Sequence, residues 1–141
     1  MKNWRNDAVE INHEPISVLF METEYTPTGI QPLFDDLCAS VDNLDNRRFF
    51  GVSTGITGTY RACVDKLAGD DPAGMGLAEW ELPGGLFAVE RVEDWPSDPG
   101  KIAAAFQRVL TAYDGRISDW GWGIEEYLAD DAVNVLIKLI D

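Results

Sequence analysis

Histidine and cysteine, the residues that most often build metal sites and nucleophilic active sites, are scarce in this sequence. His13 is the only histidine, so neither a catalytic triad built on histidine nor a metal site with several histidines fits the composition. Cys38 and Cys63 lack the close spacing of a metal site or a redox pair, and both are expected to be small buried residues. We therefore expect no metal and no other cofactor.

Long apolar runs and positive charge are also missing. No stretch approaches the roughly 18 apolar residues of a membrane span, and the N-terminus lacks the apolar core of a signal peptide, which predicts a cytoplasmic protein without a membrane partner. Eleven lysines and arginines stand against 25 acidic residues, a formal charge of −14 that repels phosphate backbones. Direct binding to nucleic acid is therefore not expected, and most carboxylates are interpreted as a solubilising surface.

What is present predicts one α+β domain. A chain of 141 residues has the usual size of a single domain, and 45% of its residues are hydrophobic. β-branched and apolar runs predict strands, and apolar residues at steps of three and four predict helices. Residues 1–14 are expected to be irregular, strands are expected at about 15–25, 49–53, 60–67, 86–92, 122–128 and 132–140, and helices at about 30–44 and 102–113.

The two halves of the domain repeat one another at an offset of 72 residues. Phe34 corresponds to Phe106 in the expected helices, and strand residues 50–52 correspond to 122–124. A strand-helix-strand-strand unit cannot cover both faces of its own short sheet, so two copies must share a core. We expect an antiparallel sheet with two helices packed on one side and a ligand cleft between the repeats. The single domain spans 15–141, with repeat one at about 15–82 and repeat two at about 83–141.

The strand at 122–128 holds the most informative polar residues. The two-residue period of a strand places Glu125 and Tyr127 on one face and Glu126 on the other. Ser53 and Gly55 stand at the corresponding positions of repeat one, so the copies differ there. A carboxylate among aromatic rings is a strong partner for an apolar cation. Spacing alone leaves open whether Glu125 or Glu126 faces the cleft, and whether either one is exposed to solvent or binds a ligand.

Four short motifs stand out: YRACV at 60–64, LPGGLFAV at 82–89, IEEYL at 124–128 and the helix from Ile30 with Leu33, Phe34 and Leu37. Together they resemble the gyrase-inhibitor-like effector-binding domains, which occur alone or attached to transcription activators of the AraC and MerR types. The resemblance covers about 15–141 and implies a hydrophobic cleft that binds bulky, often cationic, lipophilic compounds. It maps the buried acidic residue of that family onto Glu125, with Tyr127 beside it.

The leading interpretation is a stand-alone binding domain that senses or sequesters an amphiphilic cationic drug or dye, rather than an enzyme. No DNA-binding domain fits before Pro15, so a sensor would act alone, as a homo-dimer or through a protein partner. Two alternatives stay open. One is a hydrolase of reactive cytotoxic compounds that uses the same cleft, and the other is a gyrase-inhibitor-like module that binds a protein through its acidic surface. The expected ligand-binding residues are Glu125, Tyr127, Trp122, Trp80, Phe87 and Tyr25.

Overall fold

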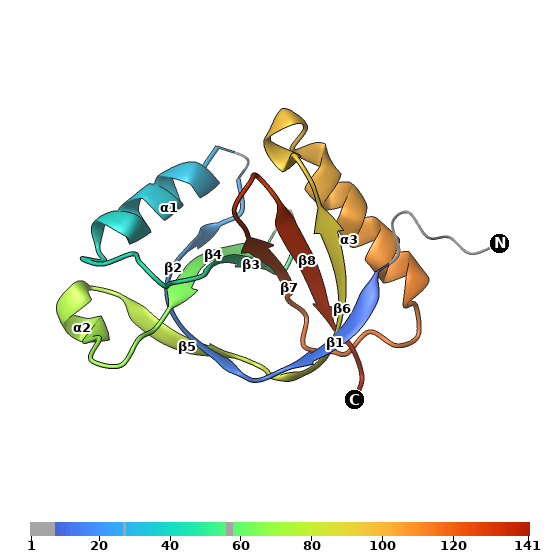
Figure 1. Ribbon diagram of the computed structural model, residues 1–141, viewed down its shortest axis with the longest axis horizontal. Coiled ribbons are helices and arrows are strands. Elements are labelled where there is room, and N and C mark those ends of the chain that lie inside the picture. Colours follow the sequence, from blue (N-terminus) through green and yellow to red (C-terminus); the bar gives the residue numbers. More distant parts are fainter. Residues whose placement is uncertain (1–7, 27, 56–57) are drawn as a thin grey trace.

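The computed structural model describes residues 8–26, 28–55 and 58–141. Within them, eight strands form one curled antiparallel sheet, and α1 and α3 lie on the outer side of the curl, one over each repeat (Figure 1). The expected α+β class is confirmed. In chain order the elements are β1 (Val9–His13), β2 (Ile16–Glu24), α1 (Ile30–Ala39), β3 (Phe49–Ser53), β4 (Thr59–Asp65), α2 (Pro72–Met75), β5 (Ala78–Leu82), β6 (Gly85–Val92), a 3₁₀ turn (Trp95–Ser97), α3 (Gly100–Ala112), β7 (Gly123–Tyr127) and β8 (Val133–Lys138).

The strand order places one repeat on each side of a central strand pair. The order is β1-β6-β8-β7-β3-β4-β2-β5, and β3 and β7 are the central pair. In this pair Val52 lies opposite Ile124, which is its own counterpart at the 72-residue offset. A pseudo-two-fold axis therefore passes through these two residues, as the duplicated sequence requires.

Neither edge strand pairs with the strand that follows it in the chain. β1 precedes β2 in the chain but pairs with β6 of repeat two, and β5 precedes β6 but pairs with β2 of repeat one. The expectation that residues 1–14 are irregular is therefore wrong for Val9–His13. Short strands at an edge bury little by themselves, and β1 is held by contacts that the local sequence does not reveal: Ile11 lies opposite Phe87, His13 stacks on the Phe87 ring at 4.3 Å, and Arg116 forms an ion pair with Glu10.

Apolar side chains fill both sides of the sheet. Inside the curl, residues from both repeats form one core, and on the outer side three smaller clusters lie beneath the helices. Each fully buried aliphatic or aromatic side chain stabilises the fold by about 1.5–3 kcal/mol. The largest fully buried side chains are Tyr60, Phe50, Phe87, Leu19, Leu37, Leu82, Ile124 and Leu139.

α1 ends at Ala39, earlier than the apolar period predicts. The Val41 N–H donates to the Cys38 carbonyl at 3.3 Å, an i→i−3 bond that tightens and closes the last turn, and the Ser40 hydroxyl donates a hydrogen bond of 2.9 Å to the Asp36 carbonyl. Val41 is still buried, but Leu44 is 38% exposed, so the apolar period outlasts the helix.

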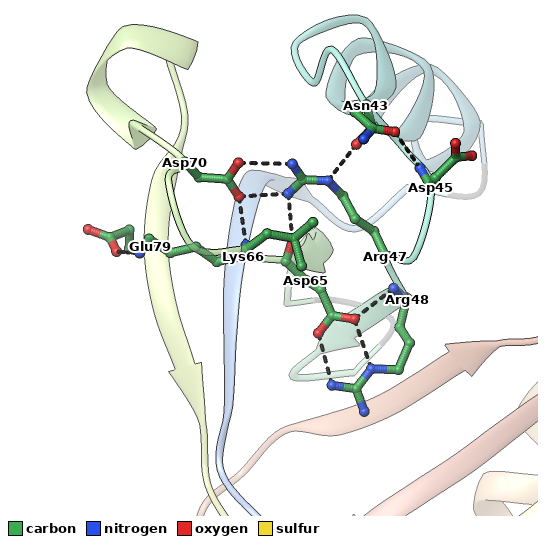
Figure 2. A network of polar contacts seen from close by, with 9 residues as sticks. Asn43, Asp45, Arg47, Arg48, Asp65, Lys66, Asp70 and Glu79 are labelled. Carbon is green, nitrogen blue, oxygen red and sulfur yellow. Dashed lines mark hydrogen bonds and ion pairs between the residues drawn. The ribbon is translucent and has the colours of Figure 1, made fainter.

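The link between α1 and β3 carries a polar network that belongs to repeat one (Figure 2). Arg47 donates to both carboxylate oxygens of Asp70, at 2.7 and 2.9 Å, and to the main-chain oxygen of Asp65. The hydrogen bond from Arg47 lowers the pKa of Asp70 to about 2. Arg48 pairs in turn with the Asp65 carboxylate. The side chains of Arg47 and Asp70 are only 5% and 10% exposed. The network therefore fixes the α1–β3 link to β4 and to the segment that follows β4.

Within the part of the chain that the structure describes, no helix is long and apolar enough to cross a membrane.

Candidate functional site

A cavity of about 860 Å³ lies between α1 and α3, above the central strands β3 and β7. Ile30 and Phe34 of α1 line one wall, and their counterparts Ile102 and Phe106 of α3 line the other. The cavity is thus located between the repeats, as expected, and its walls follow the duplicated sequence.

The floor of the cavity does not share this symmetry. Ser53 of β3 and Glu125 of β7 are counterparts, and each lies opposite a glycine, Gly123 and Gly51 respectively. Glu126 lies on the other face of the sheet, where the Asn134 side chain donates a hydrogen bond to it. Glu125 is therefore the glutamate that faces the cavity, which answers a question that the sequence left open.

Two tyrosine hydroxyls bind one oxygen of the Glu125 carboxylate. Tyr127 donates a hydrogen bond of 2.5 Å to Oε1 and Tyr60 donates one of 3.3 Å to the same atom, while the two hydroxyl oxygens lie 3.4 Å apart. Among the described residues, no hydrogen bond reaches Oε2 and no lysine or arginine forms an ion pair with Glu125. One oxygen is thus fixed in place, and the other has no hydrogen-bond partner among the described residues.

Burial sets the electrostatics of this cluster. It raises the pKa of Glu125, and the hydrogen bonds from Tyr127 and Tyr60 offset only part of that rise. Burial, with the nearby carboxylate, also raises the pKa of both tyrosines, which therefore stay neutral donors. An ionised Glu125 is costly in this apolar setting, and a cation in the cavity would relieve that cost.

Gly51 makes room for the cluster. A Cβ atom at this position would lie 1.9 Å from the Tyr60 hydroxyl oxygen and 3.0 Å from Oε1 of Glu125. Tyr60 extends from β4, is fully buried and reaches Glu125 across this gap from behind the cavity lining. In repeat two, Val135 of β8 lies opposite Glu125 as Tyr60 of β4 lies opposite Ser53, so no equivalent hydroxyl exists there.

Aromatic rings surround the Tyr127 and Tyr60 side chains. Phe34 and Trp95 both contact Tyr127 edge-on, with ring centroids 5.6 Å apart in each pair. Tyr25 contacts Tyr60 at 5.9 Å, and burial raises its pKa. The floor glutamate therefore lies among rings suited to an apolar or cationic ligand.

The structure brings together four of the six residues that the sequence indicated. Glu125, Tyr127, Tyr25 and Trp122 line the cavity.

Trp80 and Phe87 do not line it, because their strands turn these side chains to the inside of the curl. Phe87 is fully buried against His13, and Trp80 contacts Trp122 at 5.0 Å and lies beneath the Arg61 guanidinium at 4.3 Å. Both residues act here in packing.

Sequence reasoning missed several residues of the site. The sequence indicates Phe34 and Phe106 only as corresponding residues of the two helices and Tyr60 only as part of a motif, and it gives Trp95 and Gly51 no role in the site. One signal was available for the two phenylalanines, since apolar counterparts on both helices must face the same shared surface. Nothing local marks Tyr60 or Gly51.

Within the described residues, no group of three or more histidine, cysteine or acidic side chains is placed to hold a metal ion.

No family model and no curated protein sequence matches this chain. Solved structures do match it along almost its whole length. The EcmrR C-terminal domain aligns with a TM-score of 0.72 and 9% identity, covering 97% of this chain and 99% of that one. SAV2435 bound to tetraphenylphosphonium aligns with a TM-score of 0.67 and 11% identity, covering 95% and 94%.

A hydrolase from Listeria innocua aligns with a TM-score of 0.63 and 11% identity, covering 95% of this chain and 92% of that one. Identities this low show a shared fold and nothing finer. The chain thus has the fold of these proteins, which is consistent with the gyrase-inhibitor-like resemblance of its sequence.

Proposed function

We propose that this protein binds bulky amphiphilic cations in the cavity between its repeats, and so senses or sequesters them. The observation that carries the proposal is Glu125, a carboxylate at the floor of an aromatic cavity, with one oxygen held by two tyrosines and no cationic partner among the described side chains.

The chemistry of the floor favours a positive ligand over a neutral one. A neutral ligand would displace water from Glu125 and leave the charge without compensation, whereas a cation replaces that hydration. The aromatic rings at Phe34, Trp95 and Tyr127 add cation–π attraction, about 0.5–2 kcal/mol per favourable contact. Selectivity for cations follows from the same two features.

One structural neighbour supports the proposal. SAV2435, which shares the fold, is recorded in complex with tetraphenylphosphonium, a lipophilic cation. The volume of about 860 Å³ is also within the range of cavities that enclose drug-sized ligands.

Binding of tetraphenylphosphonium, measured by isothermal titration calorimetry and by quenching of tryptophan fluorescence, tests the proposal. We expect saturable binding by the wild type and a preference for this cation over neutral triphenylphosphine oxide. Glu125→Gln keeps the shape of the side chain but removes its charge, and should weaken cation binding by about 10- to 100-fold, the range expected for a lost partner of a desolvated charge.

Glu126→Gln is the matched control, because it changes the same formal charge on the other face of β7 and should alter binding less than about twofold. If the wild type shows no saturable binding, the proposed function is wrong. If Glu125→Gln binds the cation as tightly as the wild type does, the role of Glu125 is wrong.

Hydrolysis in the same cavity is the second candidate. Two observations favour it: one neighbour is described as a hydrolase, and a carboxyl group with a raised pKa beside two phenol hydroxyls is suited to transfer protons. Incubation of the protein with an electrophilic aromatic compound, followed by mass spectrometry, separates the candidates, since binding alone returns the compound unchanged. The protein-interaction alternative rests on the acidic composition and stays a prediction.

A further inference from the structure

Phe106 rests directly on the backbone of Gly123 at the cavity floor. A Cβ atom on Gly123 would lie 2.8 Å from Cε1 and 3.2 Å from Cζ of the Phe106 ring, closer than carbon atoms approach without displacement. The ring extends from α3, is half-buried and lines the cavity. The missing side chain at Gly123 is therefore a notch in the floor, and an aromatic ring occupies it.

The backbone does not require glycine at this position. Gly123 is absent from the glycines with a positive φ, so its conformation is open to alanine. The need for glycine is steric, because any side chain would push the Phe106 ring out of the notch and into the cavity.

The corresponding notch in repeat one is filled differently. At Gly51 the nearest atoms belong to Tyr60 and Glu125, and the Phe34 ring contacts Tyr127 and Tyr60 edge-on instead. Of the two phenylalanine walls, only Phe106 thus has its ring lodged against a floor glycine. Its position decides how much of the cavity stays open on the side away from the carboxylate.

We propose that Phe106, seated on Gly123, sets the size of the apolar part of the ligand that the cavity accepts. This inference rests on the proposed function and adds a size-determining residue to it. Glu125 then selects for charge, while Phe106 selects for bulk.

A pair of cations that differ in bulk tests the inference: tetraphenylphosphonium with four rings and phenyltrimethylammonium with one. Gly123→Ala should displace the ring and weaken tetraphenylphosphonium binding about tenfold, as expected for an overpacked site, while phenyltrimethylammonium changes less than about twofold. Phe106→Ala should shift the ratio of the two dissociation constants in the opposite direction by a similar factor. Thermal unfolding shows whether each variant is folded.

A double-mutant cycle identifies the Phe106 ring as the cause. In the Phe106→Ala background, Gly123→Ala should no longer change the ratio, because no ring remains to be displaced. In the Phe34→Ala background, which removes the counterpart ring of repeat one, Gly123→Ala should keep its roughly tenfold effect.

The possible failures are distinguishable. If the wild type binds both cations but Gly123→Ala leaves their ratio unchanged, or acts equally in the Phe106→Ala background, the size selection is wrong and the proposed function stands. If the wild type binds neither cation, the proposed function is wrong and the size selection fails with it.

Discussion

The two repeats share a scaffold but differ in what they place on it. Their helices supply matching walls to the cavity, through the pairs Ile30 and Ile102 and Phe34 and Phe106. On the floor, repeat two carries the carboxylate where repeat one carries Ser53. Two glutamates in one apolar cavity would repel each other, and each would raise the pKa of the other. A single carboxylate at the floor therefore requires that the duplicated units diverge there.

The links that lead from each helix to the next strand differ as well. Repeat one holds its α1–β3 link with the buried guanidinium of Arg47, whereas Asp119 stands at that position in repeat two. Next to it, Trp120 takes the place of Arg48 and packs beside Trp122 and Trp80. The link in repeat one is held by the largely buried ion pair of Arg47 with Asp70, and the link in repeat two by aromatic contacts and the more exposed ion pair of Arg116 with Glu10.

Moving the charge from one repeat to the other tests the comparison most severely. The double variant Ser53→Glu with Glu125→Ser keeps one carboxylate in the cavity, but Gly55 and Val135, at the positions equivalent to Tyr127 and Tyr60, carry no hydroxyl. Without these hydrogen bonds the carboxyl group stays protonated to higher pH, and we expect a loss of affinity for tetraphenylphosphonium of about 100-fold at pH 7. Calorimetry measures it, and affinity within threefold of the wild type would show that the two halves of the floor are equivalent.

Removing Arg47 separates the two ways of holding the link. Arg47→Ala leaves the Asp70 carboxylate without its partner and should lower the free energy of unfolding by about 2–3 kcal/mol, measured by urea denaturation. Asp119→Ala, at the exposed counterpart in repeat two, should change it by less than about 0.5 kcal/mol. Equal effects would contradict the difference in how the repeats are held.

The same pair predicts how stability depends on pH. The pKa of Asp70 is about 2 in the folded protein, below the ordinary aspartate value of 3.8, so its ionised form stabilises the fold at pH values above 3.8. This contribution should be lost as the pH falls from about 4 to 2, and the Arg47→Ala variant should show a smaller loss over that range in urea denaturation.

The two floor glycines should respond unequally to a methyl group. Gly51→Ala forces the buried Tyr60 ring to move, and should lower the free energy of unfolding by about 1–2 kcal/mol. Gly123→Ala should cost less, because the Phe106 ring borders the open cavity and has room to move. Urea or thermal unfolding of both variants measures the two losses of stability. A larger loss for Gly123→Ala would contradict the claim that the Phe106 ring has more room to move than the Tyr60 ring.

The tyrosine hydrogen bonds should produce the smallest effects. Cation binding should strengthen as the pH rises through the pKa of Glu125, which lies above its ordinary value of 4.5. Tyr60→Phe removes a hydrogen bond that lowers this pKa, so the binding curve should shift to higher pH, with affinity about threefold weaker near the midpoint. Tyr127→Phe should shift it further, because its hydrogen bond is shorter. Titrations between pH 4 and 8 measure both shifts, and a flat curve for Glu125→Gln is the control.

Much of the fold was predictable because it repeats and because its central strands alternate regularly. The strand at 49–53 has the predicted bounds, and the helices begin close to the predicted positions. β1 and β5 were not predictable as strands, because each is short and pairs with a strand that is distant in the chain. In the site, Glu125 and Tyr127 were identified from alternation and family resemblance, whereas Tyr60 was not, since it reaches Glu125 from a strand 65 positions away.

By itself, the sequence determined the duplicated unit, the alternation that puts Glu125 and Tyr127 on one face, and the acidic charge. Only the tertiary structure decided that this face lies under the helices and that Trp80 and Phe87 lie on the opposite one. Alternation fixes which side chains share a face, but the curl of the sheet and the pairing of β3 with β7 decide what each face meets. The carboxylate, its two hydroxyl donors and the glycine between them come from three strands, and the register of those strands alone brings them together.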